Sequence, residues 1–145
     1  METDIHTFFA HYESFFNRAL AGDADMAEAA GFYSPAFIAA TPRGVMTGQN
    51  DDSLRQAMAQ GYARYRAIGT KGMRLDTIRV DRIDPAHALA HVGWTATYTR
   101  PGDPDVAIAF EVHYLLQVLD GGPRIFGWIS GDEEAVLRQH GILPQ

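Results

Sequence analysis

The stretch VAIAFEVHYLLQVL, residues 106–119, alternates two kinds of side chain, and this alternation decides how the chain folds. Its even positions are all apolar or aromatic, whereas its odd positions mix alanine and leucine with Glu111, His113 and Gln117. Successive side chains of a β-strand point to opposite faces of the sheet. The even positions therefore predict a face that helices cover, and the odd positions predict an opposite, mixed face.

Three more strands are predicted around this one, over residues 71–83, 89–100 and 124–130. Pro- and Gly-rich segments at 101–104 and 120–123 join the last three strands as hairpins. The strand at 89–100 shows the same alternation, with apolar and aromatic side chains at its even positions from 92 to 98. The C-terminal half of the chain thus predicts an antiparallel sheet.

The loop before the fourth strand determines which of its side chains face the helices. If this loop pairs residues symmetrically, Tyr114 shares a face with Ile129. His113 then shares the opposite face with Trp128. A change of register by one residue would exchange the two sets, because the side-chain period of a strand is two.

Helices are predicted mainly before the sheet. Apolar and aromatic residues recur in steps of three and four over residues 4–21, which indicates an amphipathic helix that ends at Gly22. Asp23 is expected to cap a short helix over residues 24–30. A further helix is expected over residues 54–68.

Two short elements complete the predicted order. Residues 37–40 and 45–47 predict a hairpin around Thr41-Pro42-Arg43-Gly44, where Pro and Gly favour a turn. Ser130-Gly131-Asp132-Glu133 matches a capping box that begins a last helix. The acidic residues Asp132, Glu133 and Glu134 could close the mouth of a pocket, but the helix macrodipole also explains acids in a first helical turn.

Several segments, taken in order, resemble the nuclear transport factor 2-like superfamily, which includes ketosteroid isomerase, scytalone dehydratase and small polyketide cyclases. They are residues 20–23 (LAGD), 42–48 (PRGVMTG), 120–121 (DG) and 128–131 (WISG). The chain looks most like uncharacterised bacterial members. The resemblance implies a single α+β domain over residues 1–145, a cone-shaped curved antiparallel sheet closed by N-terminal helices (cystatin-like), an apolar pocket and frequent dimers.

The chemistry implied by the resemblance does not transfer directly. Ketosteroid isomerase-like enzymes carry a general-base Asp just before the Pro-x-Gly of the hairpin, where this chain has Thr41. A threonine hydroxyl cannot remove a carbon-bound proton at neutral pH. Their acid-form Asp on the third strand would fall near Tyr114, and Tyr12 lies about one turn before the place of their oxyanion-hole Tyr.

Four residues are the candidates for acid–base catalysis. His113 stands two positions from Glu111 on one strand face, and His91 lies on the preceding strand. Histidine suits proton transfer because its pKa lies near neutral pH. Tyr12 would donate a hydrogen bond to an oxyanion. The alternative is that both histidines lie on the mixed face, in a contact between two copies of the chain.

A binding pocket is predicted from aromatic side chains, several of which carry one polar tip. The chain then binds a small apolar or aromatic molecule, or it is a cofactor-free isomerase, dehydratase or cyclase. Inward even positions would favour binding, and inward odd positions would favour an enzyme. The predicted lining residues are Phe16, Tyr33, Phe37, Tyr62, Tyr65, Trp94, Phe110, Tyr114 and Trp128.

Composition narrows the remaining function classes. The 145 residues include no cysteine, and the histidine spacing matches no metal-binding motif, so we expect neither a metal nor another cofactor. A net charge of -6 and the absence of a basic cluster argue against nucleic acid as a partner. No apolar run reaches the ~20 residues that span a membrane. We expect a cytoplasmic homodimer that packs through the mixed face of the sheet.

Overall fold

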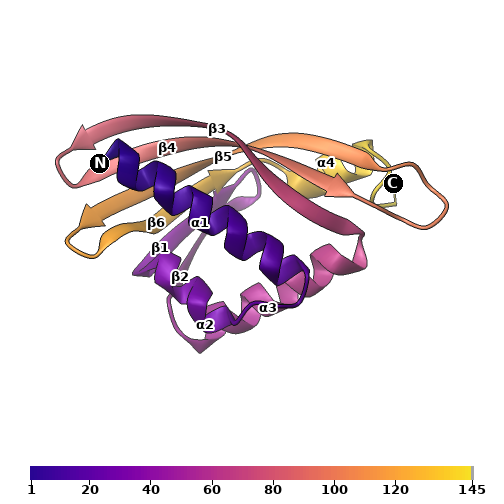
Figure 1. The fold of residues 1–145 in the computed structure, drawn as a ribbon, viewed down its shortest axis with the longest axis horizontal. Helices are drawn as coiled ribbons and strands as arrows, with labels where there is room; N and C mark the ends of the chain where they lie inside the picture. The colour runs from indigo at the N-terminus through magenta and orange to yellow at the C-terminus, as the bar shows by residue number, and fades with distance from the viewer. Residues whose placement is uncertain (145) are drawn as a thin grey trace.

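The computed structural model describes residues 1–144 and confirms the predicted α+β fold, with helices packed against a curved, unclosed sheet (Figure 1). The helices are α1 (Glu2–Leu20), α2 (Met26–Ala29), the 3-10 helix η1 (Ala30–Phe32), α3 (Asp52–Ala67) and α4 (Glu133–Gln139). The strands are β1 (Tyr33–Thr41), β2 (Gly44–Gln49), β3 (Thr70–Asp84), β4 (His87–Tyr98), β5 (Val106–Leu119) and β6 (Gly122–Ser130).

The six strands form one sheet in the order β2-β1-β6-β5-β4-β3. The four C-terminal strands pair antiparallel, as the sequence predicts, and the hairpin of β1 and β2 joins them through a parallel pairing of β1 with β6. A parallel pairing needs a long connection, because the chain must return to the same end of the sheet. Here the connection contains β2, α3 and the three strands β3 to β5.

Helix α1 packs against different partners along its length. Ile5 and Phe9 near its start are fully buried against the sheet, within the main apolar core. Phe15 and Leu20 near its end lie in a second apolar cluster with residues of α2 and α3. Although α1 is long, no helix among residues 1–144 has the length and apolarity needed to cross a membrane.

The end of α1 explains why the expected cap of the next helix is wrong. Gly22 has a φ of 83° and its N–H donates to the carbonyl of Ala19, while the N–H of Asp23 donates to the carbonyl of Arg18. These two hydrogen bonds form a Schellman motif, so Asp23 belongs to the end of α1. The N-cap of α2 is instead Asp25, which accepts from the N–H of Ala27 at 2.9 Å.

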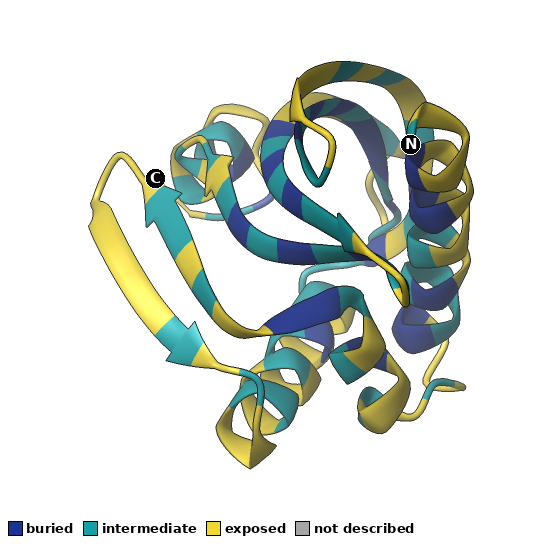
Figure 2. Ribbon diagram, turned by 90° about the vertical axis from the view of Figure 1, so that its left-hand side faces the viewer, coloured by how far each residue is buried: buried dark blue, intermediate teal, exposed yellow. Residues whose placement is uncertain are grey.

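The alternation predicted for β5 is confirmed. Ile108, Val112, Tyr114 and Leu116 are buried on the face that the helices cover, whereas Glu111 on the other face is exposed. Figure 2 shows the same alternation as stripes along the central strands, and shows that the edge strand β2 is exposed over most of its length. The even positions of β5 therefore face inward.

Strand β6 contains an extra residue that changes its register against β5. The turn before it is symmetric, because Leu119 pairs with Gly122 and Leu116 pairs with Ile125. Directly after Ile125 the register shifts by one, which leaves Phe126 without a partner on β5. An unpaired extra residue of this kind is a β-bulge.

The bulge exchanges the two faces of β6 from this point onward. Trp128 pairs with Tyr114, and Ile129 pairs with His113. Cross-strand partners point to the same side of the sheet, so Trp128 lies on the covered face. The predicted grouping of Trp128 with His113 is therefore wrong, because the symmetric turn does not fix the register beyond Phe126.

Helix α1 also completes the hydrogen bonding of the edge strand β3. The side-chain amide of Asn17 donates to the carbonyl of Met73 at 2.8 Å, and its oxygen accepts from the N–H of Met73 at 2.9 Å. The carboxylate of Glu13 accepts from the N–H of Leu75. Two side chains of a helix thus take the place of a neighbouring strand along this part of the edge.

We predict that Asn17→Ala lowers the free energy of unfolding by about 1–3 kcal/mol, because the N–H and carbonyl of Met73 lose their partner. The measurement is urea unfolding followed by circular dichroism. Ser14→Ala is the control, since Ser14 is an exposed polar residue of the same helix, and it should change the value by less than about 0.5 kcal/mol. Equal effects of the two substitutions would contradict the assignment.

Candidate functional site

A cavity of about 350 Å³ lies between α1, the covered face of the sheet and α4. Phe37 and Tyr62 are not among its lining residues: Phe37 stacks on Trp128 with ring centroids 5.3 Å apart, and Tyr62 packs against Phe15 and Phe16. Of the predicted pocket residues, those that line it are Phe16, Tyr33, Tyr65, Trp94, Phe110, Tyr114 and Trp128.

The inner end of the cavity contains two pairs of polar groups. The hydroxyls of Tyr12 and Tyr33 lie 3.1 Å apart, and the indole N–H of Trp94 donates to the hydroxyl of Tyr114 at 3.2 Å. Burial raises the pKa of the phenols of Tyr12, Tyr33 and Tyr114 above the ordinary value. These phenols therefore stay protonated at physiological pH and can donate hydrogen bonds to a bound molecule.

A carboxyl group that the sequence did not place among the candidate catalytic residues lies at the mouth of the cavity. Glu133 lines the cavity together with Tyr65, although more than a third of the Glu133 residue is exposed. Burial raises the pKa of Glu133 above its ordinary value, against the opposite effects of the Tyr65 hydrogen bond and the Arg64 charge. Glu133 can therefore take up or release a proton closer to neutral pH than an ordinary glutamate.

The start of α4 explains why Glu133 is available. Asp132 is the N-cap, because its side chain accepts from the N–H of Ala135 at 3.0 Å. Ser130 is the last residue of β6, so the predicted capping box with Ser130 as cap is wrong. Glu133 is consequently the first residue of the helix and does not have to bond back to a cap. The acidic run after Trp128 was the only sequence signal for it.

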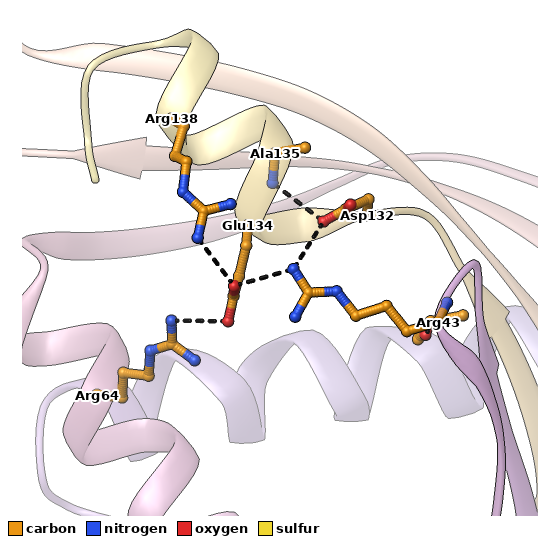
Figure 3. A network of polar contacts seen from close by, with 7 residues as sticks. Arg43, Arg64, Asp132, Glu134, Ala135 and Arg138 are labelled. Atoms are coloured by element: carbon orange, nitrogen blue, oxygen red, sulfur yellow. Dashed lines mark hydrogen bonds and ion pairs between the residues drawn. The ribbon is translucent and has the colours of Figure 1, made fainter. Parts of the chain in front are cut away.

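An ion-pair network holds α4 beside the cavity mouth (Figure 3). The carboxylate of Glu134 lies 3.1 Å from Arg43 of the β1–β2 turn, 3.3 Å from Arg64 of α3 and 3.3 Å from Arg138 of α4. Asp132 lies 3.8 Å from Arg43. Single exposed ion pairs contribute little, but a network fixes geometry more effectively. The network around Glu134 joins the β1–β2 turn, α3 and α4, which are far apart in the sequence.

The structure places the predicted acid–base residues on two different sides of the sheet. Tyr12 lines the cavity. His91 and His113 project from the opposite face, which we call the outer face and which also carries Ile129. Glu111 borders the cavity, but its carboxylate lies 3.6 Å from His113 on the outer face. The sheet therefore separates the two histidines from the cavity.

The outer face keeps apolar side chains in contact with water in the single chain. Ile38 is 45% exposed and Ile129 is 48% exposed. Exposed apolar residues on one face are typical of surfaces that bind another protein. These side chains agree with the expected homodimer through this face, which stays a prediction.

The comparisons with known proteins agree with this fold. A family model described as "NTF2-like protein (DUF6841)" matches residues 2–133. A comparison with curated proteins gives no significant match. The chain is thus similar to a family described by its fold rather than by an activity.

Solved structures of bacterial proteins are similar to this chain in fold. An NTF-2 like protein of unknown function from Shewanella oneidensis MR-1 is 18% identical, with 91% of this chain and 100% of that chain covered and a TM-score of 0.64. An NTF2-like protein with a cystatin-like fold from Novosphingobium aromaticivorans is 12% identical, with coverages of 99% and 89% and a TM-score of 0.69. A ketosteroid isomerase-like protein from Erwinia carotovora atroseptica SCRI1043 is 18% identical, with coverages of 89% and 93% and a TM-score of 0.61.

We predict that the pKa of Glu133 rises further in the Tyr65→Phe variant, because the hydrogen bond from Tyr65 stabilises the carboxylate. Carbon-13 NMR of the side-chain carboxyls between pH 3 and 8 measures this value. Glu28 is the internal control, since Arg18 lowers its pKa far from the cavity and the substitution should not change it.

The sign of the effect on stability follows from the same shift. Because burial raises the folded-state pKa of Glu133, this group contributes stability that is complete below its unfolded pKa. That contribution is lost as the pH rises through the folded pKa. A pKa of Glu133 that falls, or does not change, in Tyr65→Phe would contradict the hydrogen bond.

Proposed function

We propose that this chain, which belongs to the NTF2-like protein family DUF6841, binds a small apolar or aromatic molecule in its cavity. The observation that carries the proposal is the lining itself: aromatic walls with paired hydroxyl donors at one end. The NTF2-like fold often binds small ligands. The volume of about 350 Å³ lies near the lower end of the range of ligand pockets, which suits a compact molecule.

The arrangement of polar groups supports a ligand with one hydrogen-bond acceptor. Aromatic side chains such as Trp94 and Trp128 offer flat apolar surfaces that pack well on a ring system. The protonated hydroxyls of Tyr12 and Tyr114 lie at the same end of the cavity and can donate to a carbonyl or hydroxyl oxygen. A flat molecule with a polar atom at its buried end satisfies both features.

We predict saturable 1:1 binding of 2-naphthol, a flat aromatic alcohol, measured by tryptophan fluorescence. Trp94 and Trp128 are the two tryptophans of the chain and both line the cavity, so a bound ring should change their emission. Tyr114→Phe should weaken binding about 3–10-fold, because one hydrogen bond contributes roughly 1 kcal/mol.

Tyr62→Phe is the matched control for this experiment. It removes a tyrosine hydroxyl from a residue that packs beside the cavity but does not line it. The affinity of the Tyr62→Phe variant for 2-naphthol should equal that of the unaltered chain. Failure of 2-naphthol to saturate, or equal weakening by the two substitutions, would contradict binding in this cavity.

The carboxyl of Glu133 favours a second candidate, a cofactor-free enzyme that uses general acid–base catalysis in the same cavity. A base must reach a bound substrate and must titrate near the working pH. Glu133 lines the cavity and its pKa is raised, whereas Thr41 offers no base in the hairpin. In this candidate Glu133 removes a carbon-bound proton, and a phenol such as Tyr12 donates a hydrogen bond to the developing enolate oxygen.

We predict, for the enzyme candidate, that the chain accelerates deuterium exchange at the carbon next to the carbonyl of 2-tetralone in D₂O, followed by proton NMR. Glu133→Gln should reduce the acceleration by about 100-fold or more, as expected when a general base is removed. Glu2→Gln is the control, because Glu2 is exposed at the start of α1. Saturable binding of 2-tetralone without acceleration would leave the chain as a binding protein.

A further inference from the structure

Two histidines meet on the outer face of the sheet, away from the cavity. His91 of β4 and His113 of β5 are directly opposite each other across the two strands. Their Nδ1 atoms lie only 2.7 Å apart. In the neutral, Nε2–H form each Nδ1 atom carries a lone pair. Two such lone pairs would repel each other at this distance, so the two nitrogens share one hydrogen or bind one ion.

A carboxylate adds a third potential ligand to this pair. An oxygen of Glu111 lies 3.6 Å from Nδ1 of His113, and the ligand atoms of His91, Glu111 and His113 all lie within 4.8 Å of one another. Zinc–nitrogen and zinc–oxygen bonds of about 2.0–2.2 Å place tetrahedral ligands roughly 3.3 Å apart. The two histidine nitrogens would therefore separate by about 0.6 Å around an ion, a shift that partly exposed side chains can make.

A second carboxylate orients one of the histidines. An oxygen of Asp81 lies 2.8 Å from Nε2 of His91 and is itself 2.8 Å from the guanidinium of Arg79. Donation from Nε2–H to Asp81 leaves Nδ1 of His91 with a free lone pair that points at His113. Carboxylate–histidine pairs of this kind are typical of metal ligands, whose orientation and basicity they set.

We propose that Nδ1 of His91, Nδ1 of His113 and the carboxylate of Glu111 bind one divalent transition-metal ion such as Zn²⁺. The ion takes the place of the hydrogen between the two imidazoles, and the proton moves to Nε2 of His113. Two nitrogens and one carboxylate oxygen suit Zn²⁺ better than Mg²⁺ or Ca²⁺, which prefer oxygen ligands. Three protein ligands leave at least one coordination position open.

The sequence alone predicts no such site, because its ligands come from two strands. His91 and His113 are 22 positions apart, and only the register of β4 against β5 makes them neighbours. The site does not depend on the function proposed for the cavity. A second copy packed on the outer face would surround the site but would not change the number of ligands from each chain.

The test is titration of the untagged full chain with ZnCl₂ by isothermal calorimetry at pH 7.5. One ion per chain is the expected result. His91→Ala and His113→Ala should each weaken the affinity by about 100-fold or more, and Asp81→Asn should weaken it about 10–100-fold through the orientation of His91. Zn²⁺ should also raise the Tm of the unaltered chain, because an ion that binds the folded state stabilises it.

His87→Ala is the matched control. His87 lies on the same face of β4 and also contacts a carboxylate, Asp84, at 2.8 Å, but its Nδ1 faces that carboxylate and not a second histidine. This substitution should leave both affinity and stoichiometry unchanged. No saturable binding by the unaltered chain, one ion per two chains, or equal weakening by His87→Ala would each overturn the proposal. Circular dichroism shows whether each variant is folded, and the Tm shift tests the site without any substitution.

Discussion

The hydrogen bonds between Asn17 and Met73 are the constraint on which the position of α1 depends. An edge strand presents unpaired N–H and carbonyl groups, and here α1 supplies partners for them from its own side chains. The helix is therefore held both by its apolar stripe and by a polar contact that accepts only one register. Because Tyr12 and Phe16 lie on the same helix, the contact also fixes where two cavity-lining rings stand.

The β-bulge at Phe126 is the second constraint, and it determines what the cavity contains. If Phe126 were paired with Leu115 and no bulge formed, Gly127 would stand opposite Tyr114 and Trp128 would point to the outer face. With it, Trp128 faces inward and lies against Tyr33 and Phe37. A single unpaired residue thus places the indole of Trp128, instead of Gly127, in the wall of the cavity.

These two features show what could be predicted from the sequence and what could not. The inward face of β5 was predictable, because period-two alternation is a property of one strand and needs no partner. The side of Trp128 was not, since it depends on a bulge that no residue type announces. The position of Glu133 depends on Asp132 capping α4 in place of Ser130, and the pairing of His91 with His113 depends on register. Errors therefore arose at helix starts, where more than one residue could be the cap, and where two strands must be placed relative to each other.

The distribution of charge around the cavity limits what the proposed ligand can be. Arginines gather at the mouth around Glu134, whereas the inner end holds phenols that burial keeps neutral. A charged group carried to the inner end would lose its hydration and find no opposite charge among the lining residues there, which is costly. A neutral acceptor loses far less and gains hydrogen bonds from Tyr12 or Tyr114. The ligand that suits the cavity therefore enters with its neutral oxygen first, and it carries no anionic group at the mouth, where the carboxyls of Asp132 and Glu133 line the cavity and Glu134 already pairs with Arg43 and Arg64.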